Sequence, residues 1–373
     1  MPAIPPRHLE RITAGWSLVL AALLVVAAGC TDSLVRGRSN PDDEPDSGYG
    51  FDVGGFDVAD AGVPTADTRP DDATVDASTY PGPPYPIVLA HGFAGFDHLA
   101  DVDGLAYYVG VKKALEEAGE TVVIGEVDPF NDSTDRGEQL IDEVEAHLEN
   151  SPKRKVNIIG HSQGGLDARY VAHHRPRLVA SVVTVSAPHR GTLIADIILE
   201  IVEHDLFRDI VDEIVKLFGK ALYDEAGEET SMFEALEQFS EPGIEKFNRQ
   251  IDDQPRVYYA SVAGRTDGHL GESWCDNGEA PPFIRRWKDQ GDPVDPLLSL
   301  TESVLDGVGS RDRPNDGLVR VQDAKWGDFL GCIPADHLDE VGQLVGDSPG
   351  GDNDWSHRQF YVDLAAYLHR RGF

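Results

Sequence analysis

From Tyr85 to the C-terminus, short apolar segments alternate with segments whose apolar residues recur at helical spacing. The first kind has the length and β-branched composition of buried strands, and the second the pattern of amphipathic helices. Strands that alternate with helices form a parallel sheet covered by helices on both faces. The sequence therefore predicts one α/β domain over residues 81–373, with a mostly parallel central sheet. The expected strands are 86–90, 121–127, 155–160, 179–186 and 257–263, and the expected helices lie near 104–118, 134–149 and 165–174.

The first thirty residues have the features of an export signal. Arg7 and Arg11 precede an apolar run at residues 16–28, whose 13 residues are fewer than the roughly 20 needed to cross a bilayer. The run ends in AAGC, which resembles the lipobox of bacterial lipoproteins, so we expect residues 1–30 to be a lipoprotein signal peptide with lipidation at Cys30. The predicted location is a membrane-anchored lipoprotein of the cell envelope or surface. A secreted protein and an uncleaved signal anchor are the alternatives.

Residues 31–80 differ from the rest in composition. They are rich in Asp, Gly, Pro, Ser and Thr and have twelve acids against three bases. Such a segment cannot bury enough apolar surface to fold, so we expect a disordered acidic linker. The whole chain has a formal net charge of -34. This charge excludes nucleic acid as a partner, because phosphate recognition needs a basic surface.

The segment VNIIGHSQGG at residues 156–165 places a serine between an expected strand and an expected helix. Gly160 and Gly164 flank Ser162 and have no side chains to block a sharp turn. This strand-turn-helix setting is typical of a nucleophile elbow, in which the serine is exposed at the carboxyl edge of the sheet. The alternative is a chance G-x-S-x-G match at an ordinary turn, and the setting favours a catalytic Ser162.

A serine hydroxyl needs a general base and an orienting carboxylate to act as a nucleophile at neutral pH. In hydrolases with this elbow, the acid and then the histidine follow the serine along the chain. From pattern alone, His337 in PADHLDEVGQ and His269 both remain candidate bases. The candidate acid is Asp316 in RPNDGLVRV, with plain turn chemistry as the alternative. Two later histidines are expected to be solvated on a C-terminal amphipathic helix: His357 and His369.

The domain resembles the bacterial true lipases of the Pseudomonas and Burkholderia type, which are α/β-hydrolases that act on acylglycerols. Six motifs occur in the order of that family: YPIVLAHGFAGFD, RGEQL, VNIIGHSQGG, APHRG, NDGLV and HLDEV. The resemblance implies Ser162 as nucleophile, Asp316 as acid and His337 as base, and so decides against His269. It implies a triacylglycerol lipase that works through an acyl-enzyme. A carboxylesterase or polyester depolymerase is the alternative, and a phospholipase, an acyltransferase or a non-catalytic binding protein is less favoured.

The same resemblance predicts an oxyanion hole. Its donors are the backbone N–H groups of Phe93, which follows the His-Gly pair, and of Gln163, which follows the nucleophile. Two such donors stabilise the tetrahedral oxygen by roughly 3–4 kcal/mol each. Arg136 in RGEQL is expected to brace the oxyanion loop through backbone contacts, with an ordinary surface arginine as the alternative.

A structural calcium ion near the histidine is also implied by the resemblance. Asp339 and Gln343 are four residues apart and would share one helical face, and the backbone carbonyl of Asp347 would add a third oxygen. An upstream Asp-Pro pair supplies the fourth ligand, for which spacing favours Asp295 over Asp292. The alternative is that the acids after His337 only complement a helix N-terminus.

Two cysteines remain after Cys30, and an exported chain oxidises them. We therefore expect a Cys275–Cys332 disulfide, worth roughly 2–5 kcal/mol. Here the sequence departs from the resembled family, where the second cysteine follows the NDG motif closely. Cys332 instead lies sixteen residues after Asp316 and five before His337.

Residues from about 193 to 240 contain a broad apolar stripe at helical spacing. In the resembled family this region is the lid over the active site, and a helix packed permanently on the core is the alternative. Members of that family often depend on a membrane-bound folding chaperone. The resemblance adds such a chaperone as a candidate partner, beside the ester substrate and the membrane.

Overall fold

The computed structural model describes residues 83–93, 95, 107–202, 232–266, 275, 280–296, 298–307, 313–343 and 353–373. The predicted signal peptide, the linker and Cys30 lie outside the described residues. So do His269, Asp347 and residues 203–231 of the expected lid.

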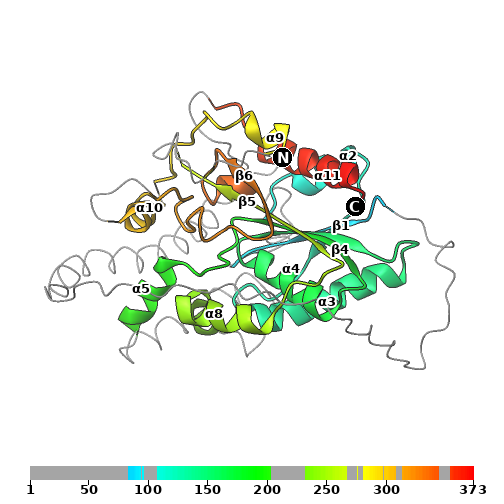
Figure 1. Cartoon of the computed structure of the whole chain (residues 1–373), viewed down its shortest axis with the longest axis horizontal. Coiled ribbons are helices and arrows are strands. Elements are labelled where there is room, and N and C mark those ends of the chain that lie inside the picture. Colours follow the sequence, from blue (N-terminus) through cyan, green and yellow to red (C-terminus); the bar gives the residue numbers. More distant parts are fainter. Residues whose placement is uncertain are drawn as a thin grey trace, which may run out of the picture.

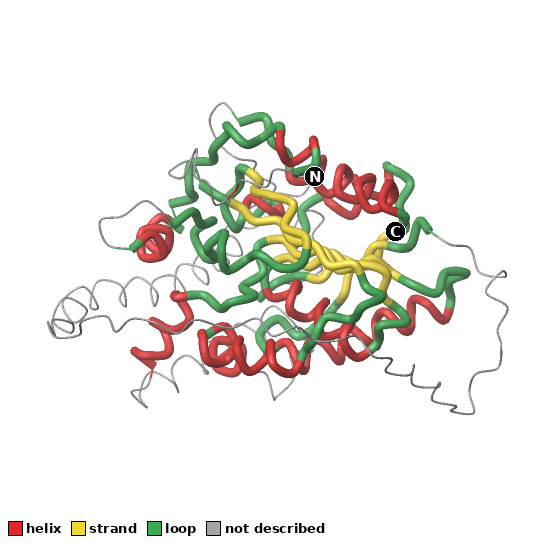
Figure 2. Tube along the Cα trace, in the orientation of Figure 1, coloured by secondary structure: helices red, strands yellow, loops and turns green. Residues whose placement is uncertain are grey.

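Six strands form one sheet, in the order β2-β1-β3-β4-β5-β6, and every neighbouring pair is parallel. Figure 2 shows this twisted sheet at the centre of the domain. The predicted α/β class with a parallel sheet is therefore confirmed. The five expected strands are present within one or two residues, and a sixth, β6, was not predicted. The strands are β1 (Ile87–Ala90), β2 (Val122–Gly125), β3 (Val156–His161), β4 (Val179–Val185), β5 (Tyr258–Gly264) and β6 (Asp328–Ile333).

Helices cover both faces of the sheet (Figure 1). They are α2 (Val111–Glu117), α3 (Ser133–Glu149), α4 (Gln163–His174), α5 (Leu193–Val202), α7 (Met232–Phe239), α8 (Glu241–Gln250), α9 (Pro282–Arg285), α10 (Ser299–Asp306), the 3-10 helix η4 (Asp339–Val341) and α11 (His357–Arg371). Strand side chains alternate between the faces, so Val88 of β1 packs with α3 and α4. Its neighbour Leu89 packs with α2 and α11 on the other face.

Two helix predictions need correction. The helix expected at 104–118 is α2, which begins only at Val111, and the described residues just before it form a turn. The helix expected from His337 is η4, a single 3-10 turn of three residues. It ends because Gly342 is left-handed, with φ 76°, and a Cβ there would lie 2.4 Å from His357 Nε2.

Because all six strands are parallel, the loops that follow them meet at one edge of the sheet, here called the carboxyl edge. The loops that precede the strands meet at the opposite, amino edge. Ser162 directly follows β3 and His337 follows β6, so both lie at the carboxyl edge. Open α/β sheets bind their ligands at this edge. None of the described helices is long and apolar enough to cross a membrane.

Candidate active site

Ser162 has a strained backbone in the turn between β3 and α4. Its φ is 53° and its ψ is -127°, a conformation that non-glycine residues rarely adopt. Hydrogen bonds hold the turn on both sides, from Ser162 N to Val185 O (2.9 Å) and from Gly165 N to Ser162 O (3.0 Å). The side chain is half-buried, so it remains accessible. Strain of this kind persists where the surrounding structure enforces it, which is typical of catalytic turns.

The two glycines of the G-x-S-x-G motif are required by close packing. A Cβ on Gly160 would come within 2.3 Å of Gly164 O. A Cβ on Gly164 would come within 2.1 Å of Ala90 O, in β1. The motif thus allows α4 to start directly against the ends of β1 and β3, which the sequence indicated only in general terms.

Asp316 and His337 are hydrogen-bonded although 21 residues separate them. His337 Nδ1 lies 2.9 Å from Asp316 Oδ2, and both side chains are almost fully buried. The other oxygen, Asp316 Oδ1, accepts from the backbone N–H groups of Leu318 (2.9 Å) and Val319 (2.7 Å). The backbone N–H of His337 also donates to Asp316 O (2.9 Å). Asp316 can therefore orient the imidazole and stabilise its protonated form.

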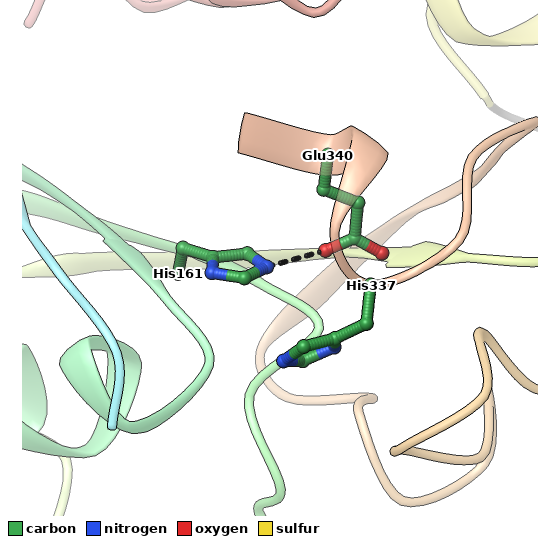
Figure 3. Close-up of side chains that lie close together, drawn as sticks. All are labelled: His161, His337 and Glu340. Atoms are coloured by element: carbon green, nitrogen blue, oxygen red, sulfur yellow. Dashed lines mark hydrogen bonds and ion pairs between the residues drawn. The ribbon is translucent and has the colours of Figure 1, made fainter. Parts of the chain in front are cut away.

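The loop with His337 packs against the elbow through His161, the residue before Ser162. The rings of His161 and His337 lie 4.6 Å apart, centroid to centroid. Figure 3 shows the two rings and Glu340 gathered at the end of the sheet. The structure thus brings the predicted nucleophile, acid and base to one edge of the sheet.

Sequence reasoning missed a buried hydrogen-bond chain beneath these residues. His161 Nε2 lies 2.9 Å from Glu340 Oε2, and Ser186 Oγ donates to Glu340 Oε1 (2.6 Å). The other ring nitrogen, His161 Nδ1, lies 2.6 Å from the hydroxyl of Tyr107. The only sequence signal was the position of Glu340 in HLDEV. Nothing in the sequence indicates its partner, 179 residues away.

Burial favours the neutral forms of His161 and Glu340 in this hydrogen-bond network. It raises the pKa of Glu340 well above its usual value, with the nearby Asp316 carboxylate adding to the effect. It lowers the pKa of His161 well below its usual value, and His337 adds to this. A neutral His161 and a protonated Glu340 share one direct hydrogen bond (Figure 3). Asp316 is the carboxylate that contacts the ring of His337 directly.

Arg136 braces the loop after β1 through backbone contacts, as predicted. Its side chain is fully buried and pairs with Asp167 (2.8 Å). It donates to the carbonyls of His91 (2.6 Å), Asp128 (2.8 Å) and Gly92 (3.4 Å). Burial, and then the charge of Arg136, lowers the pKa of His91 to about 3. His91 is therefore neutral and structural.

The two predicted oxyanion donors belong to segments that adjoin Ser162. Gly92, just before Phe93, packs so closely that a Cβ on it would lie 2.8 Å from Ser162 Cβ. Gln163 is the first residue of α4, and the first N–H groups of a helix have no acceptor within it. Its side chain is held by a bond from Nε2 to Asn131 O (2.7 Å). The ring of Phe93 packs edge-on against Phe130 and Phe239.

Three carboxylates in and beside the His337 loop form a cluster suited to a cation. One oxygen from each of Asp292, Asp336 and Asp339 lies within 4.8 Å of the others. Asp292 is fully buried, and its Oδ1 has no hydrogen-bond partner. Burial, followed by repulsion from Asp336 and Asp339, raises the pKa of Asp292 to about 9. A divalent cation with oxygen ligands would relieve both features, so the donor set fits calcium.

The cluster favours a ligand set that differs from the predicted one. It contains Asp292 in place of Asp295, because Asp292 turns inward and accepts from Asp336 N (2.6 Å). The backbone N–H of Asp295 instead donates a hydrogen bond to Asp336 Oδ2 (2.7 Å). The helical face expected to join Asp339 and Gln343 does not exist, since η4 ends at Val341. The side chain of Gln343 donates to Tyr107 O (2.9 Å).

Other sequence predictions have clear outcomes here. Cys275 and Cys332 form the expected disulfide, and both belong to an apolar cluster that includes Val319 from the Asp316 loop. The expectation that His357 is solvated was wrong. His357 is fully buried, and its Nε2 lies 2.8 Å from Val109 O.

Comparisons with known proteins agree with this geometry. A family model described as the alpha/beta hydrolase fold matches residues 85–234. A triacylglycerol lipase from Burkholderia plantarii is 31% identical over 300 residues, which cover 74% of this chain and 83% of the relative. The chain belongs to the bacterial triacylglycerol lipase family, within the α/β-hydrolases. A second member of this family, from Vibrio cholerae serotype O1, is 32% identical over 273 residues, covering 70% of this chain and 81% of the relative.

A solved structure shows the same fold. The Staphylococcus hyicus lipase superposes with a TM-score of 0.53 at 18% identity, covering 77% of this chain and 95% of that one. At this identity the likeness concerns the fold alone. Family membership confirms the resemblance that the six motifs carried.

Proposed function

We propose that this protein is a triacylglycerol lipase, a serine hydrolase that cleaves the carboxylic ester bonds of acylglycerols with Ser162, His337 and Asp316. One observation carries the assignment. The strained elbow of Ser162 stands at the carboxyl edge of the sheet, where a buried aspartate orients a histidine at 2.9 Å and that histidine packs against His161, the residue before Ser162. The chain belongs to a family whose members act on this substrate class, because its relatives are named triacylglycerol lipases.

The reaction follows from the hydrogen bonds of the site. Asp316 accepts from His337 Nδ1, so Nε2 is the ring nitrogen that can take the proton of Ser162. The serine oxygen then attacks the ester carbonyl, and the N–H groups of Phe93 and Gln163 bind the negative oxygen that forms. His337 returns the proton to the leaving alcohol, which departs and leaves an acyl-enzyme. Water, activated in the same way, releases the fatty acid.

We also propose that Asp292 and Asp339 hold a structural calcium ion. The ion would supply positive charge to three crowded carboxylates and would fix the loop of His337 to the segment after α9. Asp336 supports this loop, since its oxygens accept from the N–H groups of Leu338, Asp339 and Asp295. Gln343 and Asp347 remain candidates for further oxygen ligands.

Export and anchoring are further parts of the proposal. The sequence of residues 1–30 supports an export signal with lipidation at Cys30, followed by the acidic linker at 31–80. Membrane fractionation of cells that produce the Cys30→Ala variant tests the anchor. The variant should move to the soluble exported fraction, and unchanged membrane association would remove lipidation from the proposal.

The decisive experiment measures hydrolysis of tributyrin and triolein by the wild type and by Ser162→Ala. The wild type should hydrolyse both, and the variant should lose about 10⁶-fold in kcat, because the nucleophile is removed. Equal thermal unfolding of the two proteins shows that the variant is folded. Full activity of the variant would overturn the mechanism. Activity confined to short p-nitrophenyl esters or to polyester films would assign a carboxylesterase or a polyester depolymerase instead.

A further inference from the structure

Basic side chains collect at the amino edge of the sheet, opposite to Ser162. Three loops there lead into β3, β4 and β5: residues 150–155, 175–178 and 251–257. Together they have six bases and two acids, whereas residues 81–373 as a whole have 27 bases and 53 acids. The domain thus concentrates positive charge at one place on a surface that is otherwise acidic.

Five of these bases form what we call the basic edge: Lys153, Arg154, Lys155, Arg177 and Arg256. The sixth, Arg175, is paired with Glu145 of α3 at 2.7 Å. Arg154, Arg177 and Arg256 are exposed. Lys155 donates to Val179 O across to β4 (3.2 Å). The loops that precede three neighbouring strands therefore place these bases in a row along the amino edge.

Like charges crowd one another within this row. Burial, followed by repulsion from Arg256, lowers the pKa of Lys155. In Asp253, one of the two acids, the carboxylate accepts a hydrogen bond from the indole N–H of Trp326 (3.0 Å). Bases that repel each other, as Lys155 and Arg256 do, are a favourable place for a polyanion to bind, because an added anion also relieves the repulsion.

The chain itself enters the domain beside the basic edge. Pro86, just before β1, accepts a hydrogen bond from Asn157 N (2.8 Å), and Asn157 lies two residues after Lys155. The preceding segment at residues 31–80 has twelve acids, and its stretch from 39 to 68 has eight acids and no base. The acidic segment is therefore attached next to the row of opposite charge.

Reach and local concentration favour this segment over other anions. The loop before β5 is three strand spacings from β1, or about 15 Å. Ten extended residues span about 35 Å, so even Asp76 can reach every base of the row. A covalently attached partner of this kind has an effective concentration in the millimolar range. The remaining surface, which is strongly acidic, repels the segment.

We propose that the acidic segment at residues 31–80 docks along the basic edge of its own domain. Its carboxylates pair with the bases of the loops that enter β3, β4 and β5. Docking at the amino edge leaves Ser162 open at the opposite edge. Docking also fixes how the domain is oriented relative to the N-terminal segment. The active site then faces away from the docked segment. This inference does not rest on the catalytic assignment.

Zero-length carbodiimide cross-linking tests the docking, because it joins lysines only to carboxylates in contact. The experiment uses the full chain with Cys30→Ser in a neutral detergent, and mass spectrometry identifies the links. Lys153 and Lys155 should cross-link to acids of residues 42–76. Lys112 and Lys113, which are exposed on the first turn of α2, provide the comparison. After correction for lysine reactivity, the yield at the basic edge should be at least about fivefold higher at about 50 mM salt and should fall to the comparison level at about 0.5 M, where screening is strong.

Matched charge reversals complete the test. Arg154→Glu with Arg177→Glu should reduce the link yield at Lys155 about fivefold, since both remove charge from the row. Lys112→Glu with Lys113→Glu changes the net charge equally and should leave that yield unchanged. Retained hydrolysis of a soluble short ester shows that both variants are folded.

Two outcomes would overturn the docking. Equal yields at the four lysines would mean that the segment touches the domain at random. Absent links, with sedimentation of the chain on phosphatidylglycerol vesicles that depends on Arg154 and Arg177, would assign the basic edge to an anionic membrane surface instead.

Discussion

At the scale of single residues, the two oxygens of Asp316 have separate roles. Oδ1 is held by the N–H groups of Leu318 and Val319, and Oδ2 faces His337 Nδ1. The carboxylate therefore cannot rotate without losing backbone hydrogen bonds. Its orientation selects the tautomer of His337 whose Nε2 is free of a proton, which is the form that a general base needs.

This arrangement makes Asp316→Asn a specific test. The amide oxygen should take the place of Oδ1, because only an acceptor satisfies the two N–H groups. The amide NH₂ then faces His337 Nδ1 and forces the proton to Nε2, the wrong tautomer. We expect a loss of about 10⁴-fold in kcat, with thermal stability close to that of the wild type. A loss below tenfold, measured with tributyrin, would contradict the role of Asp316.

At the scale of elements, the disulfide joins a loop to the strand that leads to the catalytic histidine. Cys332 is in β6, five residues before His337, and Cys275 lies 57 residues earlier in the chain. Their apolar cluster includes Leu318 and Val319, the residues that bind Asp316. The bridge thus supports the acid and the base together.

Replacing both cysteines with serine should lower the free energy of unfolding by about 2–5 kcal/mol. Urea unfolding of the Cys275→Ser, Cys332→Ser variant measures this change. The variant should also lose hydrolytic activity at lower urea concentrations than those that unfold the sheet, because the cluster under Asp316 is weakened first. Coincident loss of activity and of helical circular dichroism would show that the bridge has no special link to the site.

The carboxylate cluster allows a second prediction at this scale, which separates Asp292 from Asp295. Calcium should raise the melting temperature of the wild type, and a chelator should reverse the effect, because only the folded protein presents the cluster. Asp292→Asn should abolish the calcium response, whereas Asp295→Asn should keep it, since Asp295 is not a member of the cluster. A response lost in Asp295→Asn and kept in Asp292→Asn would restore the ligand that spacing favoured.

The elements also show what the sequence could reveal. The five predicted strands and the helices α3 and α4 followed from apolar periodicity, and the placement of Ser162 followed from strand-turn-helix order. Strand β6 was missed because DFLGCI is a short run that contains Asp and Gly. The turn at η4 was taken for a helix because the contact of Gly342 with His357 is tertiary. The pair of His161 and Glu340 could not be predicted, since only the tertiary fold brings together residues so distant in sequence.

At the scale of the whole molecule, charge is distributed unevenly between the two edges of the sheet. The basic edge lies where the chain enters, and the site with its crowded carboxylates lies at the opposite edge. The net charge of -34 is therefore not a uniform property of the surface. The interior differs from both edges in charge, because burial there favours the neutral form of several histidines.

These buried histidines predict a loss of stability in mild acid. Burial lowers the pKa of His91 to about 3 and the pKa values of His161 and His189 well below the usual 6.5. Below pH 6.5 these histidines bind protons in the unfolded chain but stay unprotonated in the folded chain. The free energy of unfolding therefore falls as the pH falls. Each such group contributes about 1 kcal/mol per pH unit. The buried Glu340, whose pKa is raised, acts in the opposite direction.

His189 offers the clearest single measurement, because it lies away from the triad, beside Arg169 and Thr184. Burial, and then the charges of Arg169 and Arg190, lowers its pKa. Urea unfolding at pH 7, 6 and 5 should show that His189→Gln reduces the pH slope by about 1 kcal/mol per pH unit. His174→Gln, which replaces an exposed histidine at the end of α4, provides the matched comparison. Equal slopes for the wild type and His189→Gln would mean that His189 takes up its proton without unfolding.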